Sequence, residues 1–246
     1  MVDINRYSGQ IAINDISIDG QKRLSGSTVA VVGIGGNGAI AAELFARMGI
    51  GRIRVIDNDS VRENNLHRQF LYGEDDLGKP KVISAAGRLK AINRSVEVDT
   101  VNDYLTEKNS ASLIRGSSLV YDGTDNFASR YAINSACFDL GIPFVMTSSI
   151  QYWGEIIPVL PGKTACLKCL NIPVVEEGSC SRIGIFPPAV VLTAAIAVSA
   201  AVSILTGKLE AGYIKIADAR NGTVETVITE RNPACPVCGK LTYKSG

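Results

Sequence analysis

The chain has 246 residues, 46% of them apolar, which fits one large globular domain or one domain with an appendage. Its 25 Lys and Arg residues nearly balance its 24 Asp and Glu residues. Without a clear positive excess, we expect neither nucleic acid nor an anionic membrane among its partners. The first residues lack a basic head followed by an apolar run, so we predict no signal peptide and a cytoplasmic location.

The chain begins with a segment, residues 1–25, that predicts one or two amphipathic helices. Predicted strands and helices then alternate, with a polar loop at 58–79 that Leu71 and Tyr72 anchor to the core. In chain order the elements are a strand at 28–32, a helix at 36–48, a strand at 52–56, a helix at 79–92, a strand at 96–101, a helix at 106–115, a strand at 119–121, a helix at 127–140 and a strand at 143–147. This alternation predicts an α/β, Rossmann-like fold with a mostly parallel sheet and helices on both faces.

The pattern changes after residue 148, where strands are predicted at 153–160, 212–217 and 223–228. Between them lies an apolar run, 189–205, which has two readings: a transmembrane helix or a buried core helix. Because a bilayer span needs about 20 apolar residues, and this run is shorter and contains three hydroxyl side chains, we predict a buried helix. No clean linker divides the chain, so we expect a single domain over 1–246.

A glycine-rich turn follows the first predicted strand and opens the first long helix. Its glycines are Gly33, Gly35, Gly36 and Gly38. Backbone N–H groups at such a helix N-terminus hold phosphate, and an acid at the end of the second strand, here Asp57, accepts ribose hydroxyls. The same pattern fits an NAD-dependent oxidoreductase, which would need a hydride-transfer site elsewhere. The single histidine, His67, lies in the loop on the phosphate side, where we expect it to position neighbouring groups rather than carry protons.

Charged and amide side chains gather where the predicted strands end, and open α/β sheets bind ligands at that edge. Arg68 and Lys81 can pair with the β- and γ-phosphates of ATP. Asp125, after a strand and before a helix, is placed to hold Mg²⁺, although Asp125 or Asn126 could instead cap that helix. With the glycine turn, the set favours nucleotide binding. The further candidate nucleotide-binding residues are Asp59, Asn65, Gln69 and Asn126.

Four of the six cysteines form two Cys-x-x-Cys pairs far apart in the chain. The pairs are Cys166 with Cys169 and Cys235 with Cys238. Two such pairs predict a closed, structural Cys₄ zinc site near the end of the chain. A pair of redox dithiols is the alternative, but it does not explain why there are two similar pairs.

The two remaining cysteines differ in their surroundings. Cys180 stands alone in a polar stretch, where Arg182 favours its thiolate and Glu176 and Glu177 oppose it. A nucleophilic role and an inert loop position both stay open for Cys180. Cys137, inside a predicted helix, is expected in the core.

Together these residues resemble the ThiF/MoeB family, adenylyltransferases that activate ubiquitin-like sulfur-carrier proteins. The resemblance runs from Arg6-Tyr7 to Cys238-Gly239 and rests on specific motifs. They are the glycine turn, Asp57, Asn-Leu-His-Arg-Gln at 65–69, Gly-Lys-Pro-Lys at 78–81, residues 122–126 and both cysteine pairs.

The resemblance implies that ATP and Mg²⁺ bind with Asp57 on the ribose, with Asn65, Arg68 and Lys81 on the phosphates, and with Asp125 on the metal. The C-terminal Gly-Gly carboxylate of a carrier protein then attacks the α-phosphate, giving an acyl-adenylate and pyrophosphate. A sulfur donor afterwards converts the adenylate to a thiocarboxylate. On this reading residues 1–150 form the nucleotide-binding half, and residues 151–246 form a carrier-binding half closed by zinc.

The resemblance also implies a homodimer in which an N-terminal arginine reaches the partner subunit's ATP. Gly9 stands where that arginine is expected, so we expect Arg6, one helical turn earlier, to substitute for it. Cys180 matches a loop cysteine that some members use in sulfur transfer. The substitution at Gly9 keeps a non-catalytic nucleotide- or carrier-binding homologue open as an alternative.

Overall fold

The computed structural model describes residues 2–170, 183–209 and 212–239. Its centre is an eight-stranded sheet in the order β3-β2-β1-β4-β5-β6-β7-β8. Strands β1 to β5 are parallel, and β6, β7 and β8 each run antiparallel to the strand before. The strands are β1 (Thr28–Val32), β2 (Arg52–Ile56), β3 (Glu97–Val101), β4 (Leu119–Asp122), β5 (Phe144–Ile150), β6 (Trp153–Val159), β7 (Tyr213–Asp218) and β8 (Thr223–Ile228).

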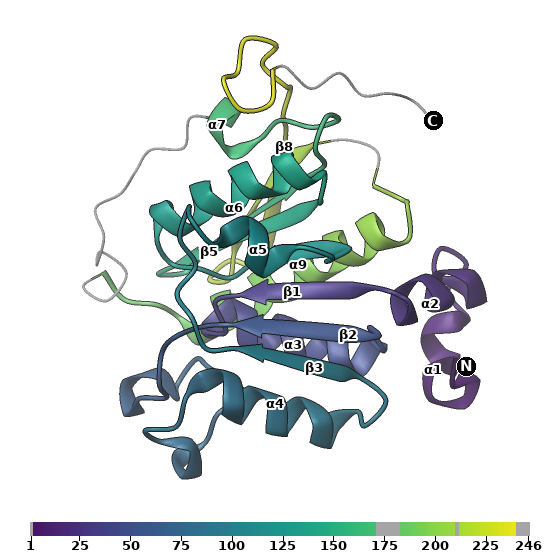
Figure 1. The fold of residues 1–246 in the computed structure, drawn as a ribbon, viewed down its shortest axis with the longest axis vertical. Helices are drawn as coiled ribbons and strands as arrows, with labels where there is room; N and C mark the ends of the chain where they lie inside the picture. Colours follow the sequence, from purple (N-terminus) through teal and green to yellow (C-terminus); the bar gives the residue numbers. More distant parts are fainter. Residues whose placement is uncertain (1, 171–182, 210–211, 240–246) are drawn as a thin grey trace.

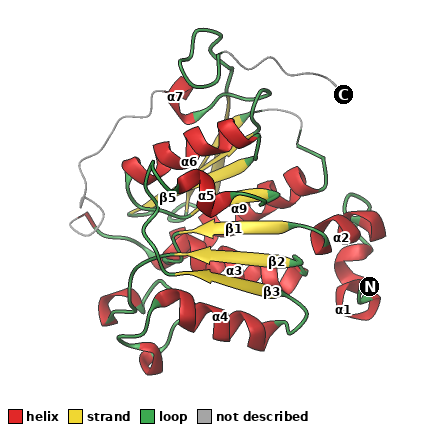
Figure 2. Ribbon diagram, in the orientation of Figure 1, coloured by secondary structure: helices red, strands yellow, loops and turns green. Residues whose placement is uncertain are grey.

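Helices cover both faces of this sheet, as the sequence predicts (Figure 2). The helices are α1 (Ile4–Ile11), α2 (Ser17–Ser25), α3 (Gly36–Met48), α4 (Lys81–Ile92), α5 (Ser110–Ile114), α6 (Phe127–Leu140), α7 (Leu167–Leu170) and α9 (Pro187–Leu205). Buried side chains of α3, α4 and α9 pack on one face, and those of α5 and α6 pack on the other. The α/β, Rossmann-like prediction is therefore confirmed.

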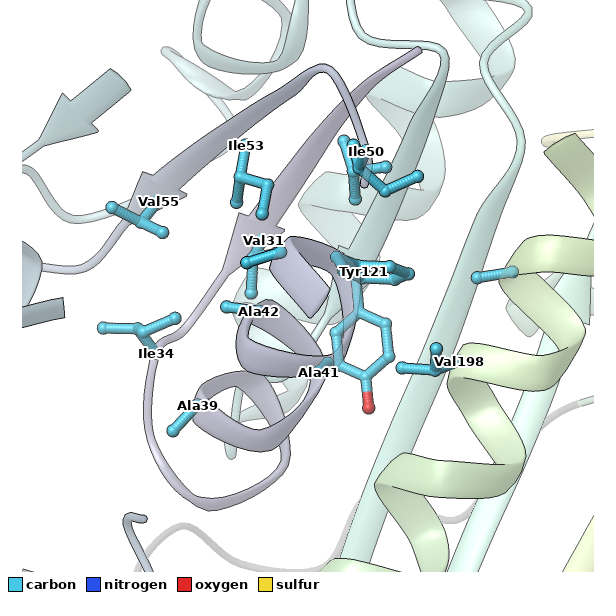
Figure 3. Close-up of a cluster of buried hydrophobic side chains, with 14 of the residues drawn as sticks. Val31, Ile34, Ala39, Ala41, Ala42, Ile50, Ile53, Val55, Tyr121 and Val198 are labelled. Atoms are coloured by element: carbon cyan, nitrogen blue, oxygen red, sulfur yellow. The ribbon is translucent and has the colours of Figure 1, made fainter. Parts of the chain in front are cut away.

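The core on the α3 face combines β-branched strand residues with small helix residues. Val31 and Ile53 lie against Ala42 of α3, and Val198 of α9 lies beside Tyr121 (Figure 3). All but Val198, which is 3% exposed, are fully buried. Burying a side chain of this size contributes about 1.5–3 kcal/mol, so the apolar character of both faces of β1 helps to hold the sheet between its helices.

Helix α9 is the predicted core helix. It packs against α3, β5 and β6, and Gly154 of β6 lets it approach, because a Cβ there would lie 1.7 Å from the Thr193 hydroxyl oxygen. Within the described residues, α9 is also a helix long and apolar enough to cross a membrane, and half of its most apolar window is buried inside the protein. Length and composition alone are weak evidence for a membrane span, and the packing agrees with the core position.

One predicted helix is too long. Residues 106–115 were expected to be helical, but α5 begins only at Ser110. The Asn109 side-chain oxygen accepts hydrogen bonds from the backbone N–H (2.7 Å) and the hydroxyl (3.0 Å) of Thr106. A side chain that bonds the backbone in this way competes with helical hydrogen bonds, so residues 106–109 form a turn instead.

Helices α1 and α2 lie at the end of the sheet opposite the strand arrowheads (Figure 1). The Tyr7 hydroxyl accepts a hydrogen bond of 2.9 Å from the Asn93 amide, and the Tyr7 ring packs over Gly49. These buried contacts attach the N-terminal helices to the ends of α3 and α4, at the amino-terminal edge of the parallel strands.

Candidate active site

Two loops meet where the strand order reverses, between β1 and β4. Gly33 follows β1 and adopts a left-handed φ of 79°. A Cβ at Gly33 would lie 2.8 Å from the Gly123 carbonyl oxygen, and one at Gly123 would lie 2.7 Å from the Gly33 oxygen. Only glycine allows this approach at both positions. The crevice at the carboxyl ends of such neighbouring strands is where open α/β sheets bind ligands.

Helix α3 starts in this crevice without a side-chain cap. A Cβ at Gly38 would lie 1.9 Å from the Gly33 oxygen, and one at Gly36 would lie 2.9 Å from Val190 of α9. The glycines therefore let the turn fold tightly and leave the first N–H groups of α3 for a ligand. Uncapped N–H groups at a helix N-terminus attract phosphate.

Asp57 follows β2 and is bonded to both loops beside it. One carboxylate oxygen accepts from the Ile34 N–H and the other from the Asp59 N–H, each at 2.8 Å. Burial raises the pKa of Asp57, while the charge of Lys81 and the two N–H bonds lower it. The carboxylate lies beside the glycine turn, with lone pairs free to accept further hydrogen bonds.

Lys81 is the first residue of α4, and its side chain is only 5% exposed. Its ammonium nitrogen lies 2.9 Å from a carboxylate oxygen of Asp59, which is half exposed. This pair places a positive charge beside Asp57. The predicted residues Asp57, Asp59 and Lys81 are thus brought together.

Residues 65–69 lie against the glycine turn. A Cβ at Gly36 would lie 3.7 Å from the Arg68 carbonyl oxygen, and one at Gly35 would lie 3.5 Å from the Gln69 amide nitrogen. Gln69 is 4% exposed, and its amide oxygen has no hydrogen-bond partner in the described part of the chain. The guanidinium of Arg68 donates to the Asn64 carbonyl at 2.9 Å, and the Asn65 amide donates to the Asn64 side chain at 3.1 Å.

Asp125 and Asn126 have different surroundings. The Asn126 side chain accepts from the Ser129 N–H at 2.8 Å and caps α6, as the capping alternative expects. Asp125 is exposed, and its carboxylate has no hydrogen bond or ion pair with any described residue. A free carboxylate beside a phosphate-binding turn fits a Mg²⁺ ligand.

Two polar groups near the site were not predicted. The Ser149 hydroxyl at the end of β5 donates to the side-chain oxygen of Asn37 at 3.1 Å. Arg130, in the first turn of α6, is buried and donates to the backbone beside Asp125. Asn37 stands inside the glycine motif, which is a usable signal, whereas nothing local marks Arg130.

The four predicted zinc ligands come together. Their sulfur atoms all lie within 4.8 Å of one another, and three of the pairs are 3.8, 3.6 and 3.2 Å apart. Sulfurs around a tetrahedral zinc lie about 3.8 Å apart, given Zn–S bonds of about 2.3 Å. Burial opposes the charged form of Cys235, but the N–H groups of Cys238 and Val237 lower its pKa to about 7. The donor set fits zinc.

Of the remaining predicted residues, Cys180 cannot be placed and Arg6 lies away from the crevice. Cys180 falls in residues 171–182, outside the described residues. Arg6 donates to the Ile92 carbonyl at 2.7 Å, at the edge of the sheet opposite the glycine turn. Gly9 faces open space, with nothing within 4 Å of an added Cβ.

The fold and this crevice define a protein of the nucleotide-binding α/β class, with a separate four-cysteine cluster. The ThiF family model matches residues 7–237, and the chain belongs to the ThiF family.

Curated relatives match nearly the whole chain. The sulfur carrier protein adenylyltransferase of Thermus thermophilus is 36% identical over 96% of this chain and 91% of its own length. The SAMP-activating enzyme E1 of Haloferax volcanii is 35% identical over 96% and 89%. Among solved structures, E. coli MccB with AMPCPP and MccA has a TM-score of 0.85 at 23% identity, covering 98% of this chain and 75% of that one. At that identity the likeness is one of fold.

Proposed function

We propose that this protein is an ATP-dependent adenylyltransferase that activates the C-terminal Gly-Gly carboxylate of a ubiquitin-like sulfur-carrier protein. The observation that supports it most is the crevice at the carboxyl ends of the parallel strands, where an uncapped glycine turn, Asp57 and Lys81 lie near the loop that carries Asp125, whose carboxylate has no partner among the described residues. Relatives named sulfur carrier protein and molybdopterin-synthase adenylyltransferases, at 32–36% identity, support the substrate class.

In the reaction, a carboxylate oxygen of the carrier attacks the α-phosphorus of ATP and forms an acyl-phosphate bond. The bond from that phosphorus to the bridging oxygen breaks, and pyrophosphate leaves with the electron pair. The nucleophile is already an anion, so the protein needs no general base. Catalysis then consists of positioning the two substrates and neutralising charge on the leaving group.

The residues of the crevice divide this work. The N–H groups of the glycine turn and α3 hold the phosphates, and Asp57 accepts hydrogen bonds from the ribose hydroxyls. Lys81 and Arg68, with Asn65 and Gln69, bind the β- and γ-phosphates. Asp59 accepts a hydrogen bond from the Lys81 ammonium group and holds it in place. Asp125 is the ligand for Mg²⁺, which when bound screens charge on the polyphosphate.

The second half of the chain supplies the carrier surface and the zinc site. Every residue of β8 is exposed, and large apolar side chains of β6 and β8 are exposed on both faces of this half of the sheet. They are Trp153, Val224, Val227 and Ile228. The carrier protein binds against residues 151–246, and the four cysteines hold a structural zinc ion. A sulfur donor acts after adenylation, with Cys180 as a candidate thiol.

The proposal includes a homodimer with an arginine from α1 serving the partner subunit's site. Within one subunit, α1 lies at the edge of the sheet opposite the crevice, so Arg6 cannot reach the crevice of its own subunit (Figure 1). A second candidate, a non-catalytic binding homologue, has one observation in its favour: Gly9 leaves open space where the family resemblance expects that arginine.

The test is the mass of the carrier itself. Incubation with ATP, Mg²⁺ and Gly-Gly-ended carriers should add one AMP to the matching carrier, and a carrier without its last glycine should gain none. Nucleotide choice is checked separately, because ATP with Mg²⁺ should raise the melting temperature and NAD should not. A larger shift with NAD would favour the oxidoreductase reading. ATP binding without an AMP adduct on any carrier would favour the non-catalytic homologue.

A further inference from the structure

Arg130 is a buried arginine whose guanidinium joins two backbone segments. Arg130 lies in the first turn of α6, and the residue is 7% exposed. The Nη2 atom donates to the Thr124 carbonyl at 3.0 Å and to the Thr147 carbonyl at 3.3 Å. One nitrogen therefore connects the loop after β4 to strand β5, and the guanidinium also lies 5.2 Å from the centre of the Phe127 ring.

The charge of this guanidinium acts on two acids, the buried Asp122 and the half-buried Glu155. Asp122 ends β4 with no exposed surface, and Glu155 lies on β6. One Asp122 oxygen accepts from the N–H (3.0 Å) and hydroxyl (2.7 Å) of Thr124, and the other has no partner in the described chain. Burial disfavours the charged form of both acids, and the Arg130 charge opposes that effect at each. Arg130 is the cation that acts on Asp122 in the described part of the chain, and without it Asp122 would there be a buried carboxylate that lacks a compensating charge.

The loop that Arg130 holds is the one that carries Asp125. Gly123 is in backbone contact with Gly33 of the phosphate-binding turn, and Thr124 follows it. Asn126 caps α6 on the other side of Asp125. The Asp125 carboxylate has no partner among the described residues, so its position depends on these neighbours and on the bonds that Arg130 and Asp122 make to Thr124.

We infer that Arg130 is a positioning residue: it holds residues 122–126 in the geometry in which Asp125 serves the metal and Gly123 supports the phosphate turn. The inference rests on the proposed adenylyltransferase function. Arg130 itself contacts neither ATP nor the carrier protein in this proposal. Mutation of a residue that orients a metal ligand typically lowers metal affinity or activity by about 10- to 100-fold. We expect an effect of this size when Arg130 is replaced.

The experiment compares Arg130→Met and Arg130→Lys with Arg54→Met as the matched control. Arg54 also donates to two backbone carbonyls, those of Leu113 and Arg115, each at 3.0 Å, but it lies on β2 away from the loop. In Arg130→Met, the Mg²⁺ concentration for half-maximal pyrophosphate–ATP exchange should rise about 10-fold or more, with the KM for carrier unchanged. Arg130→Lys keeps the charge and should give a smaller rise, and Arg54→Met should give none.

A second measurement needs no substrate. Amide hydrogen exchange over residues 123–126 should be faster in ligand-free Arg130→Met than in the wild type and unchanged in Arg54→Met. If Arg130→Met does not fold, Arg130→Lys carries both comparisons. An unchanged magnesium requirement, or an equal change in Arg54→Met, overturns the inference. If wild-type protein shows no exchange with any carrier, the proposed function fails, and amide exchange alone decides for or against Arg130 holding the loop.

Discussion

Lys81 shows how a single residue is prepared for phosphate. Its side chain is nearly buried, yet its ammonium group lies beside Asp59, a half-exposed carboxylate at the mouth of the crevice. Because Asp59 is half exposed, water can solvate its carboxylate once Lys81 binds another anion. A polyphosphate that carries several charges should therefore displace Asp59 from Lys81 without a large cost.

The phosphate clamp can be tested by single substitutions. Lys81→Ala and Arg68→Ala should each reduce adenylation by about 100-fold or more, because each removes positive charge from the transition state. The controls are Lys79→Ala and Arg62→Ala, exposed cations in the same region, which should keep normal rates. Pyrophosphate–ATP exchange measures all four, and near-normal exchange in Lys81→Ala or Arg68→Ala would show that the clamp is wrongly assigned.

Asp122 predicts a pH-dependent stability. Burial raises its pKa, and the Arg130 charge and the Thr124 bonds lower it only in part. The native state thus binds this proton more tightly than the unfolded chain, whose Asp pKa is about 3.9, so the contribution of Asp122 to the free energy of unfolding falls as pH rises through its native pKa.

Asp122→Asn keeps the shape of the side chain and removes this titration. The melting temperature of the variant minus that of the wild type should therefore increase as the pH is raised from about 3.9, the pKa of Asp in the unfolded chain, towards neutral pH. Any change in stability that the amide group itself causes does not depend on pH, so it only adds a constant to this difference. If the difference stays the same at every pH, Asp122 does not titrate in this range.

At the scale of elements, helix α1 raises the question of the missing arginine. Arg6→Ala should lower activity if Arg6 serves the partner subunit, and Gly9→Arg should be neutral or activating. Gly9→Ala is the control, because both substitutions add about 1 kcal/mol of helix propensity but only one adds a guanidinium. If Arg6→Ala catalyses pyrophosphate–ATP exchange as fast as the wild type, Arg6 does not replace the arginine expected at position 9. Activity that appears only in Gly9→Arg would indicate a lapsed enzyme.

The four-cysteine cluster predicts a structural metal. Purified protein should hold about one zinc per chain. Cys169→Ser should destabilise the fold, seen as a lower melting temperature, and should change ATP affinity little. The reason is that α7, which carries Cys169, is bonded to α6 away from the crevice: the Leu167 N–H donates to the Asn134 side chain at 3.0 Å. Elemental analysis of reduced, chelator-free protein reports the metal, and its absence there would refute the prediction.

The sequence predicts helices and strands well where neighbouring residues alone determine them. The apolar periodicity and terminal glycines of residues 36–48 predict α3 to the residue, and residues 127–140 predict α6 in the same way. The helix over 106–115 was predicted too long because a single side chain, Asn109, changes the turn. For the site, Asp57 and Lys81 were predictable from strand ends and motif. Arg130 was not, because its partners, Thr124 and Thr147, come near it only in the folded chain.

The whole molecule combines two kinds of sheet. The parallel half, from β3 to β5, has helices on both faces and carries the crevice at its carboxyl edge. The antiparallel half ends in β8, an exposed strand with apolar side chains. A nucleotide in the first half and a protein surface on the second are what an enzyme that joins AMP to a protein C-terminus requires.

Pyrophosphate–ATP exchange with matched carriers tests the central claim most directly, since it requires reversible formation of the acyl-adenylate. The account predicts that a Gly-Gly-ended carrier supports exchange, that the same carrier without its last glycine does not, and that Lys81→Ala slows exchange by about 100-fold or more. Exchange that is independent of the carrier, or absent with every Gly-Gly-ended carrier in a full panel, would contradict the account.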